Sequence, residues 1–218
     1  MFEFNFDYLL KDDLLPGSPA HTSDSEYTLN SNGFRTKEFS DVDWGESVVI
    51  FGDSCVFGFG VDPEETLSAW LEVLINRPVL NLGSSGCSNL FTMYNNMRLL
   101  SKYNPYAVIN IWTSPERTTT FRKHSEGCHQ SYVTHWGNWN HTYKPYTDFW
   151  MKEEFNYMTH TKLIIDTCEL LNKDNRYLNY ILPPPNLPGR ARDGIHPDGA
   201  YYMIQAEMIH KDFVKNEW

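Results

Sequence analysis

The chain has few of the features that mark exported, membrane-bound or nucleic-acid-binding proteins. It has four cysteines in 218 residues, none of them in a Cys-x-x-Cys pair, and acidic residues follow Met1 where a secretory signal would carry positive charge. No apolar run approaches the roughly 20 residues that span a bilayer. The 18 Lys and Arg face 28 Asp and Glu, and this net charge of −10 disfavours phosphate binding. We therefore expect a cytoplasmic or virion-associated protein with free thiols, no secretion signal, and neither a nucleic-acid nor a membrane partner.

The composition is that of a globular domain with one core. Hydrophobic residues make up 41% of the chain, and 13 Gly and 12 Pro are ordinary numbers, which argues against a disordered or fibrous protein. The length suggests a single domain with an excursion. Residues 1–46 are polar and contain turn-forming pairs such as Pro16-Gly17. We expect them to form an irregular N-terminal arm packed on a domain that covers 47–218.

Four short apolar runs in this domain are typical of strands buried on both faces of a parallel sheet. They cover residues 48–51, 78–82, 107–112 and 177–182. Helical patterns lie between and after them, over residues 63–75, 89–100, about 150–171 and about 199–214. This alternation implies right-handed βαβ crossovers, and the predicted fold is a three-layer α/β/α sandwich with a central parallel sheet.

Residues 115–149 do not fit this alternation. They lack a convincing apolar period but hold four of the eight histidines, His124, His129, His135 and His141, and a cluster of Trp and Tyr. The histidines lack the His-x-x-x-His spacing of helical zinc sites, so we expect no metal. A loop this long inside a compact domain is functional or disordered, and its aromatic richness argues against disorder. Two roles stay open: a lid whose rings stack on a sugar or an acyl group, or an aromatic mini-core that pins the loop.

Small polar residues follow three of the apolar runs. In an open α/β sheet, ligands bind at the carboxyl ends of the strands, so these positions are where chemistry is expected. They are Gly52-Asp53-Ser54, Gly83-Ser84-Ser85-Gly86 and Thr113-Ser114. Near the other end of the chain, Asp193 and His196 stand three residues apart in a Gly- and Pro-containing loop. A serine on a tight turn together with an Asp–His pair supplies a nucleophile, a base and an orienting carboxylate.

The set of motifs resembles the SGNH, or GDSL-type, hydrolase superfamily. The similar stretches are Phe51-Gly52-Asp53-Ser54 with Phe57-Gly58-Phe59-Gly60-Val61, Asn81-Leu82-Gly83-Ser84-Ser85-Gly86, Asp193-Gly194-Ile195-His196-Pro197, and the upstream Asn30-Ser31-Asn32-Gly33-Phe34-Arg35. The resemblance implies a flavodoxin-like fold and a reaction that needs no cofactor. It makes Ser54 the nucleophile, His196 the general base and Asp193 the residue that orients the imidazole. It also implies an oxyanion hole that uses the backbone N–H groups of Ser54 and Gly86.

The third block departs from the family pattern. Where the family has Gly-x-Asn-Asp, with the asparagine as a third oxyanion donor, this chain reads Thr113-Ser114-Pro115-Glu116-Arg117. Aligning the strand ends puts Ser114 at the asparagine's place, and its hydroxyl can donate one hydrogen bond. Arg117 could supply positive charge to a substrate, or it could form a salt bridge with Glu116 or a neighbouring carboxylate.

These residues predict a serine esterase that acts on small acyl esters, with O-acetyl groups of a carbohydrate as the expected substrate. The residues expected to contact that substrate are Trp112, Arg117, Trp136 and Trp139. Two alternatives stay open. One is an acyltransferase on the same three residues, with a sugar hydroxyl as acceptor. The other is a catalytically impaired module that binds glycan or assembles into a larger particle, which the missing asparagine would favour.

Overall fold

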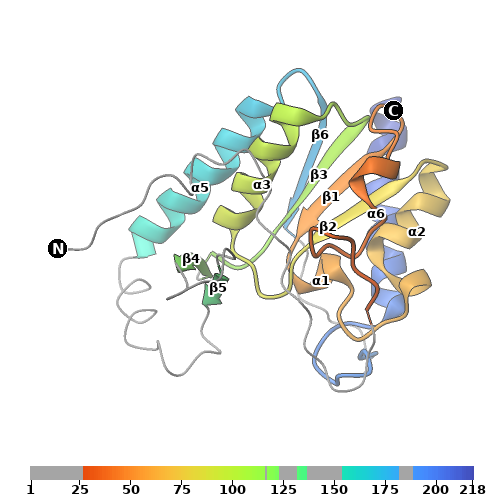
Figure 1. Cartoon of the computed structure of the whole chain (residues 1–218), viewed down its shortest axis with the longest axis horizontal. Helices are drawn as coiled ribbons and strands as arrows, with labels where there is room; N and C mark the ends of the chain where they lie inside the picture. Colours follow the sequence, from red (N-terminus) through yellow and green to blue (C-terminus); the bar gives the residue numbers. More distant parts are fainter. Residues whose placement is uncertain (1–26, 116, 123–131, 137–153, 182–188) are drawn as a thin grey trace.

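A parallel sheet forms the centre of the molecule (Figure 1). The computed structural model describes residues 27–115, 117–122, 132–136, 154–181 and 189–218. The strands of the sheet are β1 (Val48–Gly52), β2 (Val79–Gly83), β3 (Ala107–Trp112) and β6 (Arg176–Ile181). They pair in parallel in the order β2-β1-β3-β6. This is the order with which flavodoxin-like folds begin, so the predicted fold class is confirmed.

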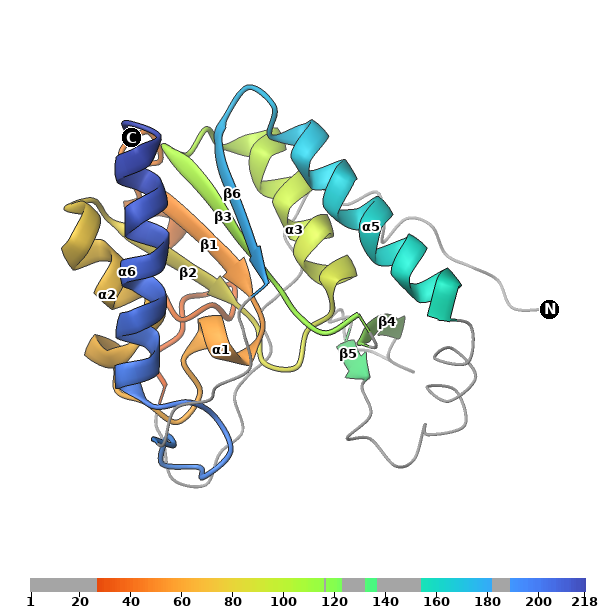
Figure 2. The ribbon, with the colours of Figure 1, turned by 180° about the vertical axis from the view of Figure 1, so that it is seen from behind.

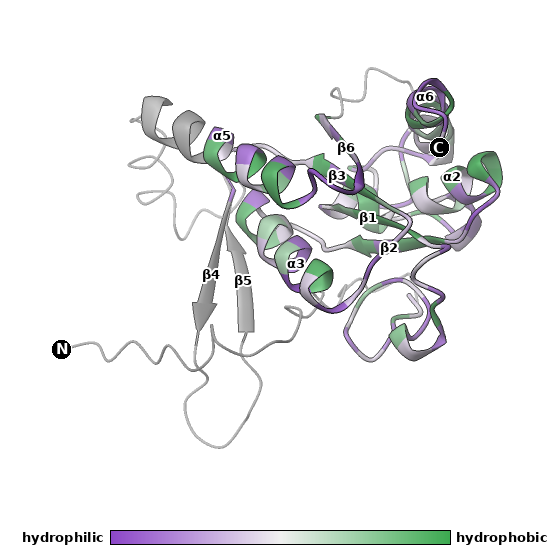
Figure 3. Cartoon of the chain, turned by 90° about the horizontal axis from the view of Figure 1, so that it is seen from above, coloured by the Kyte–Doolittle hydropathy of each residue, from purple (hydrophilic) through white to green (hydrophobic). Residues whose placement is uncertain are grey.

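Helices cover both faces of the sheet, as the edge-on view in Figure 3 shows. Val48 and Ile50 of β1 point to the face covered by α2 (Leu67–Ile75) and α6 (Gly199–Lys215). Val49 and Phe51 alternate to the other face, against α3 (Asn89–Lys102). Because every residue of β1 is buried, the run is apolar throughout instead of alternating with polar residues. The carboxyl end of β1 is thus held by packing on both faces of the sheet.

Polar side chains cap the starts of the helices. The Ser88 hydroxyl accepts from the Phe91 N–H at the start of α3. Asp62 forms a capping box with Glu65, but this box begins a 3-10 turn (Pro63–Glu65) instead of the helix itself. Helix α2 starts after it, at a second cap formed by Thr66. The expected helix at 63–75 is therefore divided into two pieces.

The described part of the N-terminal segment packs on the sheet. Phe34 is fully buried beside Val49 and Phe51. A short 3-10 helix (Phe39–Asp41) follows, and Phe39 makes an edge-on ring contact with Trp44. The expectation of an arm over 1–46 falls partly outside the described residues, since the description begins at residue 27.

The segment after β3 holds a pair of strands that the sequence analysis did not predict. Strands β4 (Thr118–Arg122) and β5 (Tyr132–Trp136) pair antiparallel. Their residues are β-branched, aromatic and polar, a composition that suits strand pairing without producing an apolar period. Helix α5 (Glu154–Leu171) follows and lies beside α3 (Figure 2).

Among the residues that the structure describes, no helix has both the length and the apolar character needed to cross a membrane.

Candidate active site

Three residues from opposite ends of the domain form a chain of hydrogen bonds. Ser54 is the first residue of α1 (Ser54–Phe57) and directly follows the turn after β1. Its Oγ lies 2.9 Å from Nε2 of His196, and Nδ1 of His196 lies 2.5 Å from Oδ2 of Asp193. This is the order of contacts that a hydroxyl nucleophile, an imidazole base and an orienting carboxylate require.

The turn that carries Ser54 is tight, and the residues packed around it leave no room for a side chain at Gly52. A Cβ added at Gly52 would lie 2.4 Å from Cγ2 of Val56. The Asp53 carboxylate caps α1 by accepting from the Cys55 N–H. Gly58 ends α1 at φ +76°, a left-handed conformation that favours glycine. Ser54 is held at one end of this short helix and is 5% exposed.

The loop that carries the other two residues is closed by its own hydrogen bonds. Oδ1 of Asp193 accepts from the N–H groups of Ile195 (2.9 Å) and His196 (3.0 Å). The Ala191 N–H donates to the His196 carbonyl at 2.8 Å. Asp198 then caps α6 by accepting from the Tyr201 N–H. The imidazole therefore reaches Ser54 from a loop whose geometry is set within a few residues.

The carboxylate of Asp193 is held in its charged form. Burial alone would raise its pKa, but hydrogen bonds from the His196 ring and from the backbone N–H groups of His196 and Ile195 outweigh this effect. The pKa is therefore lowered from the ordinary 3.8. A charged Asp193 favours the tautomer of His196 with its proton on Nδ1, which leaves Nε2 free to accept the proton of Ser54.

Two residues of the N-terminal segment support this site, and the sequence analysis gave them no role. Arg35 donates to the carbonyls of Gly58 (2.6 Å) and Val61 (3.0 Å), just after α1. Tyr27 accepts from the Gly60 N–H at 2.8 Å. The Gly60 carbonyl in turn accepts from the N–H of Arg192, next to Asp193, at 3.1 Å. Residues 58–61 thus link the Ser54 turn to the Asp193 loop, and the only signal for Arg35 was its place in the quoted upstream motif.

The expected oxyanion donors lie in the three turns at the carboxyl edge of the sheet. Ser54 N–H belongs to the first turn of α1, where backbone N–H groups have no partner within the helix. Gly86 has φ +73°, so a side chain there would be strained. Ser114 is half-buried in the turn after β3. Their joint role as oxyanion donors stays a prediction.

Arg117 lies against a neighbouring carboxylate. Its Nη1 is 2.5 Å from Oδ2 of Asp53, the residue that precedes Ser54. The Thr113 hydroxyl donates to the same oxygen at 2.7 Å. Of the two roles considered for Arg117, the structure therefore favours a salt bridge, with Asp53 as the partner. Glu116, the other partner considered, lies outside the described residues.

Of the three tryptophans expected at the substrate, the structure describes the side chain of Trp112, which is buried in the core. Trp112 is 3% exposed and packs with Ile164 and Cys168, and its Nε1 lies 3.3 Å from Oδ1 of Asn179. This placement corrects the expectation that Trp112 contacts substrate, because the last residue of a doubly covered strand faces the core. Trp136 ends β5, and Trp139 lies outside the described residues.

The described cysteines, Cys55, Cys87 and Cys168, are free thiols with raised pKa values. Burial raises the pKa of Cys87 to about 12 and that of Cys168 to about 12. Burial and the nearby Asp53 charge raise the pKa of Cys55 well above its ordinary value. Because the thiolate is the reactive form, these raised pKa values disfavour the three thiols as nucleophiles, and Ser54 is the candidate nucleophile.

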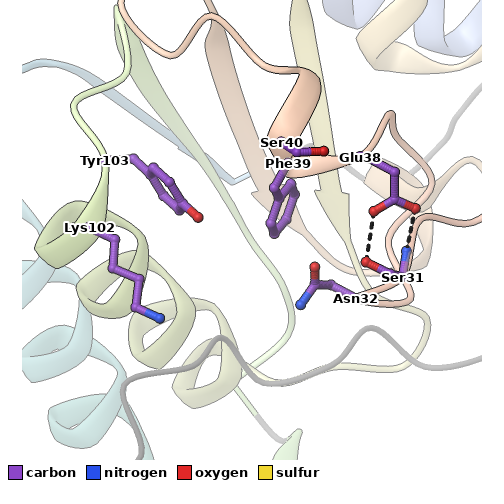
Figure 4. Close-up of a pocket in the computed structure, with 7 residues that line it drawn as sticks. All are labelled: Ser31, Asn32, Glu38, Phe39, Ser40, Lys102 and Tyr103. Carbon is purple, nitrogen blue, oxygen red and sulfur yellow. Dashed lines mark hydrogen bonds between the residues drawn. The ribbon is translucent and has the colours of Figure 1, made fainter.

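A cavity of about 230 Å³ lies apart from these residues (Figure 4). It is lined by Ser31, Asn32, Glu38, Phe39, Ser40, Lys102 and Tyr103. Lys102 and Tyr103 stand at the end of α3, which runs back to the amino edge of the sheet. The cavity shares no residue with the Ser54 site, so we assign it no part in the chemistry.

Comparison with known proteins finds likenesses at the level of the fold. No protein-family model matches the chain, and no curated protein matches it. Among solved structures, it is similar to a family two carbohydrate esterase from Clostridium thermocellum in complex with cellohexaose, at 12% identity and TM-score 0.43, covering 81% of this chain and 66% of that one. A putative lipolytic protein of the G-D-S-L family from Desulfitobacterium hafniense DCB-2 is similar at 16% identity and TM-score 0.40, covering 76% of this chain and 98% of that one.

A third likeness is to a carbohydrate esterase family 2 enzyme with a carbohydrate-binding domain from Corynascus thermopiles (Myceliophthora fergusii). It has 13% identity and TM-score 0.42, and it covers 79% of this chain and 67% of that one. The strand order β2-β1-β3-β6 and its parallel register define the fold, and a fold does not by itself fix an activity.

Proposed function

We propose that this chain is a serine esterase of the SGNH type that hydrolyses small acyl esters. The observation that carries the proposal is the continuous set of hydrogen bonds from Ser54 Oγ through the His196 ring to Asp193. A serine hydroxyl is a weak nucleophile until a bonded base removes its proton in the transition state. An imidazole ring can accept this proton at one nitrogen and later return it.

The reaction would proceed in two halves. Ser54 Oγ attacks the ester carbonyl as His196 Nε2 takes its proton, and the oxygen that becomes negative is stabilised by the N–H groups of Ser54 and Gly86 and by the Ser114 hydroxyl. The intermediate collapses when His196 returns the proton to the leaving alcohol, which leaves an acyl group on Ser54. His196 then takes a proton from a water molecule as this water attacks the acyl group. His196 returns the proton to Ser54 Oγ as the bond between the acyl carbon and Oγ breaks, which releases the acid and restores Ser54.

A small, neutral substrate fits the surroundings of His196. The half-buried Phe59 ring lies 5.0 Å from the His196 ring and gives the site an apolar wall. The net charge of −10 disfavours a strongly anionic substrate. We propose an O-acetyl group on a carbohydrate as the substrate, supported by the concentration of Trp and Tyr in residues 115–149.

The test is hydrolysis of p-nitrophenyl acetate and of acetylated sugars by the purified full-length chain, together with labelling by a fluorophosphonate probe. We expect labelling and turnover in the wild type and in Ser101→Ala, which alters an exposed serine of α3. Ser54→Ala should abolish both. Unchanged turnover in Ser54→Ala would contradict the assignment, and glycan binding without turnover or labelling would favour the impaired module.

Analysis of the reaction products distinguishes a hydrolase from an acyltransferase. With an acyl donor and a sugar acceptor both present, a hydrolase releases free acid in proportion to the donor consumed. An acyltransferase instead passes the acyl group to a sugar hydroxyl, and the acylated sugar accumulates.

A further inference from the structure

The three turns that hold the expected oxyanion donors are bonded to one another in pairs. The first pair joins the turn after β1 to the turn after β2. The Gly52 carbonyl accepts from the Ser84 N–H at 2.9 Å and from Cys87 Sγ at 3.2 Å. Both contacts are buried, so the backbones that carry Ser54 and Gly86 are fixed relative to each other.

The second pair joins the start of α3 to the turn after β3. Asn89 is 4% exposed, and its side-chain amide forms hydrogen bonds with both the N–H and the carbonyl of Thr113. Oδ1 accepts from the Thr113 N–H at 2.9 Å, and Nδ2 donates to the Thr113 carbonyl at 3.0 Å. One buried amide therefore satisfies both backbone groups of the residue that precedes Ser114.

The third pair closes the triangle through Asp53. Oδ2 of this carboxylate accepts from the Thr113 hydroxyl at 2.7 Å and from Arg117 Nη1 at 2.5 Å, while Oδ1 accepts from the Cys55 N–H at 2.9 Å. Asp53 is 8% exposed, and a carboxylate this buried is costly unless it is paired with a positive charge. Arg117 supplies that charge from the far side of the turn.

Ser114 stands between the two anchors on this carboxylate. Thr113 precedes it, and Arg117 both binds Asp53 and donates its backbone N–H to the Ser114 carbonyl at 3.2 Å. A serine Oγ is one bond closer to the backbone than an asparagine amide nitrogen, so the backbone must stand correspondingly closer to the substrate. Because a misplacement of about 1 Å can cost on the order of 10²-fold in rate, such a donor needs a rigid mount.

We infer that Arg117, acting through Asp53, is a positioning residue that holds Ser114 as an oxyanion donor beside Ser54. The inference rests on the proposed function. It replaces the expectation that Arg117 contacts substrate, and it gives the altered third block a working arrangement. In the family pattern, the longer asparagine side chain reaches the oxyanion. In this chain, the Arg117–Asp53 ion pair holds the backbone in place so that the shorter Ser114 side chain reaches it.

The test is a double-mutant cycle in the full-length chain, with Arg117→Gln, Ser114→Ala and the two combined. We measure kcat and KM for p-nitrophenyl acetate, the rate of fluorophosphonate labelling and Tm. Removal of one oxyanion donor costs roughly 10²-fold in kcat, and displacement of that donor is expected to cost roughly tenfold or more. If Arg117 acts through Ser114, the double variant is as slow as Ser114→Ala alone, and KM stays within about twofold throughout.

Arg77→Gln is the matched control, since Arg77 pairs with Glu46 before β2 at the opposite edge of the sheet, and its kcat should equal that of the wild type. If Arg117→Gln fails to fold, the Asp53→Asn/Arg117→Gln pair replaces it, because that pair leaves no buried unpaired charge. The same cycle with Ser114→Ala is then expected to be non-additive.

Several results would overturn the inference. Additive losses in kcat would show that Arg117 does not act through Ser114, and a loss confined to KM would return Arg117 to substrate binding. Both results require an active wild type, so they leave the proposed esterase in place. A wild type that neither turns over ester nor labels would overturn the proposed function and this inference with it.

Discussion

Two parts of the candidate site are held in different ways. Asp193 and His196 are oriented by contacts between residues two or three positions apart, and one backbone bond from Arg192 to Gly60 ties their loop to the rest of the site. The turn with Ser114 is fixed by partners 24 to 64 positions away in the chain, namely Asn89, through its bonds to Thr113, and Asp53. A local motif can carry its own geometry, whereas the other turn takes its geometry from the assembled sheet.

A substitution in the Asp193–His196 pair should lower kcat the most. Asp193→Asn keeps the shape of the side chain but favours the wrong tautomer of His196, so we expect kcat for p-nitrophenyl acetate to fall by roughly 10⁴-fold. Circular dichroism should show the fold intact. A loss smaller than about tenfold would mean that Asp193 does not orient the base.

Removing the donor from the second part should cost less. Ser114→Ala is expected to lower kcat by roughly 10²-fold with little change in KM, because a hydrogen bond to the oxyanion forms fully only in the transition state. Ser114→Asn, which restores the residue of the family pattern, is the comparison variant. An unchanged kcat in Ser114→Ala would place the third donor elsewhere.

Removing a side chain that positions Ser114, while leaving Ser114 itself unchanged, should lower kcat less than Ser114→Ala does. Asn89→Ala removes the amide that grips Thr113 and leaves two backbone groups without their partner, so we expect about 1–3 kcal/mol lower stability and a roughly tenfold lower kcat. Urea unfolding and steady-state kinetics measure the two effects. Asn216→Ala serves as the control, since the Asn216 side chain makes an exposed hydrogen bond at the end of α6.

The smallest effect concerns pH. Because the folded-state pKa of Asp193 is lowered below 3.8, its hydrogen bonds stabilise the fold above the unfolded pKa, and this stabilisation is lost as pH falls through the folded pKa. The stability difference between the wild type and Asp193→Asn should therefore shrink when urea unfolding is moved from pH 6 to pH 3. A difference that grows on acidification would contradict the lowered pKa.

The same contrast explains what the sequence could reveal. The strands were predictable because burial on both faces makes each run apolar, and the Asp193–His196 spacing was visible within four letters. The fold then brought Ser54 to His196 because both stand at the carboxyl edge of one sheet.

Other features depend on contacts that no local pattern records. The salt bridge from Arg117 to Asp53 joins residues 64 positions apart, and nothing near Arg117 pointed to that partner. Trp112 was expected at the substrate, yet its place at the end of a covered strand buries it. The pairing of β4 with β5 depends on backbone hydrogen bonds, which leave no apolar period to read.

The salt bridge at Asp53 also fixes where the chain leaves the sheet. Arg117 is the last residue before β4, so the turn that holds Ser114 is anchored to the Ser54 turn immediately before the β4–β5 pair begins. We therefore expect substitutions within β4 or β5 to leave the positions of Ser114 and Ser54 unchanged.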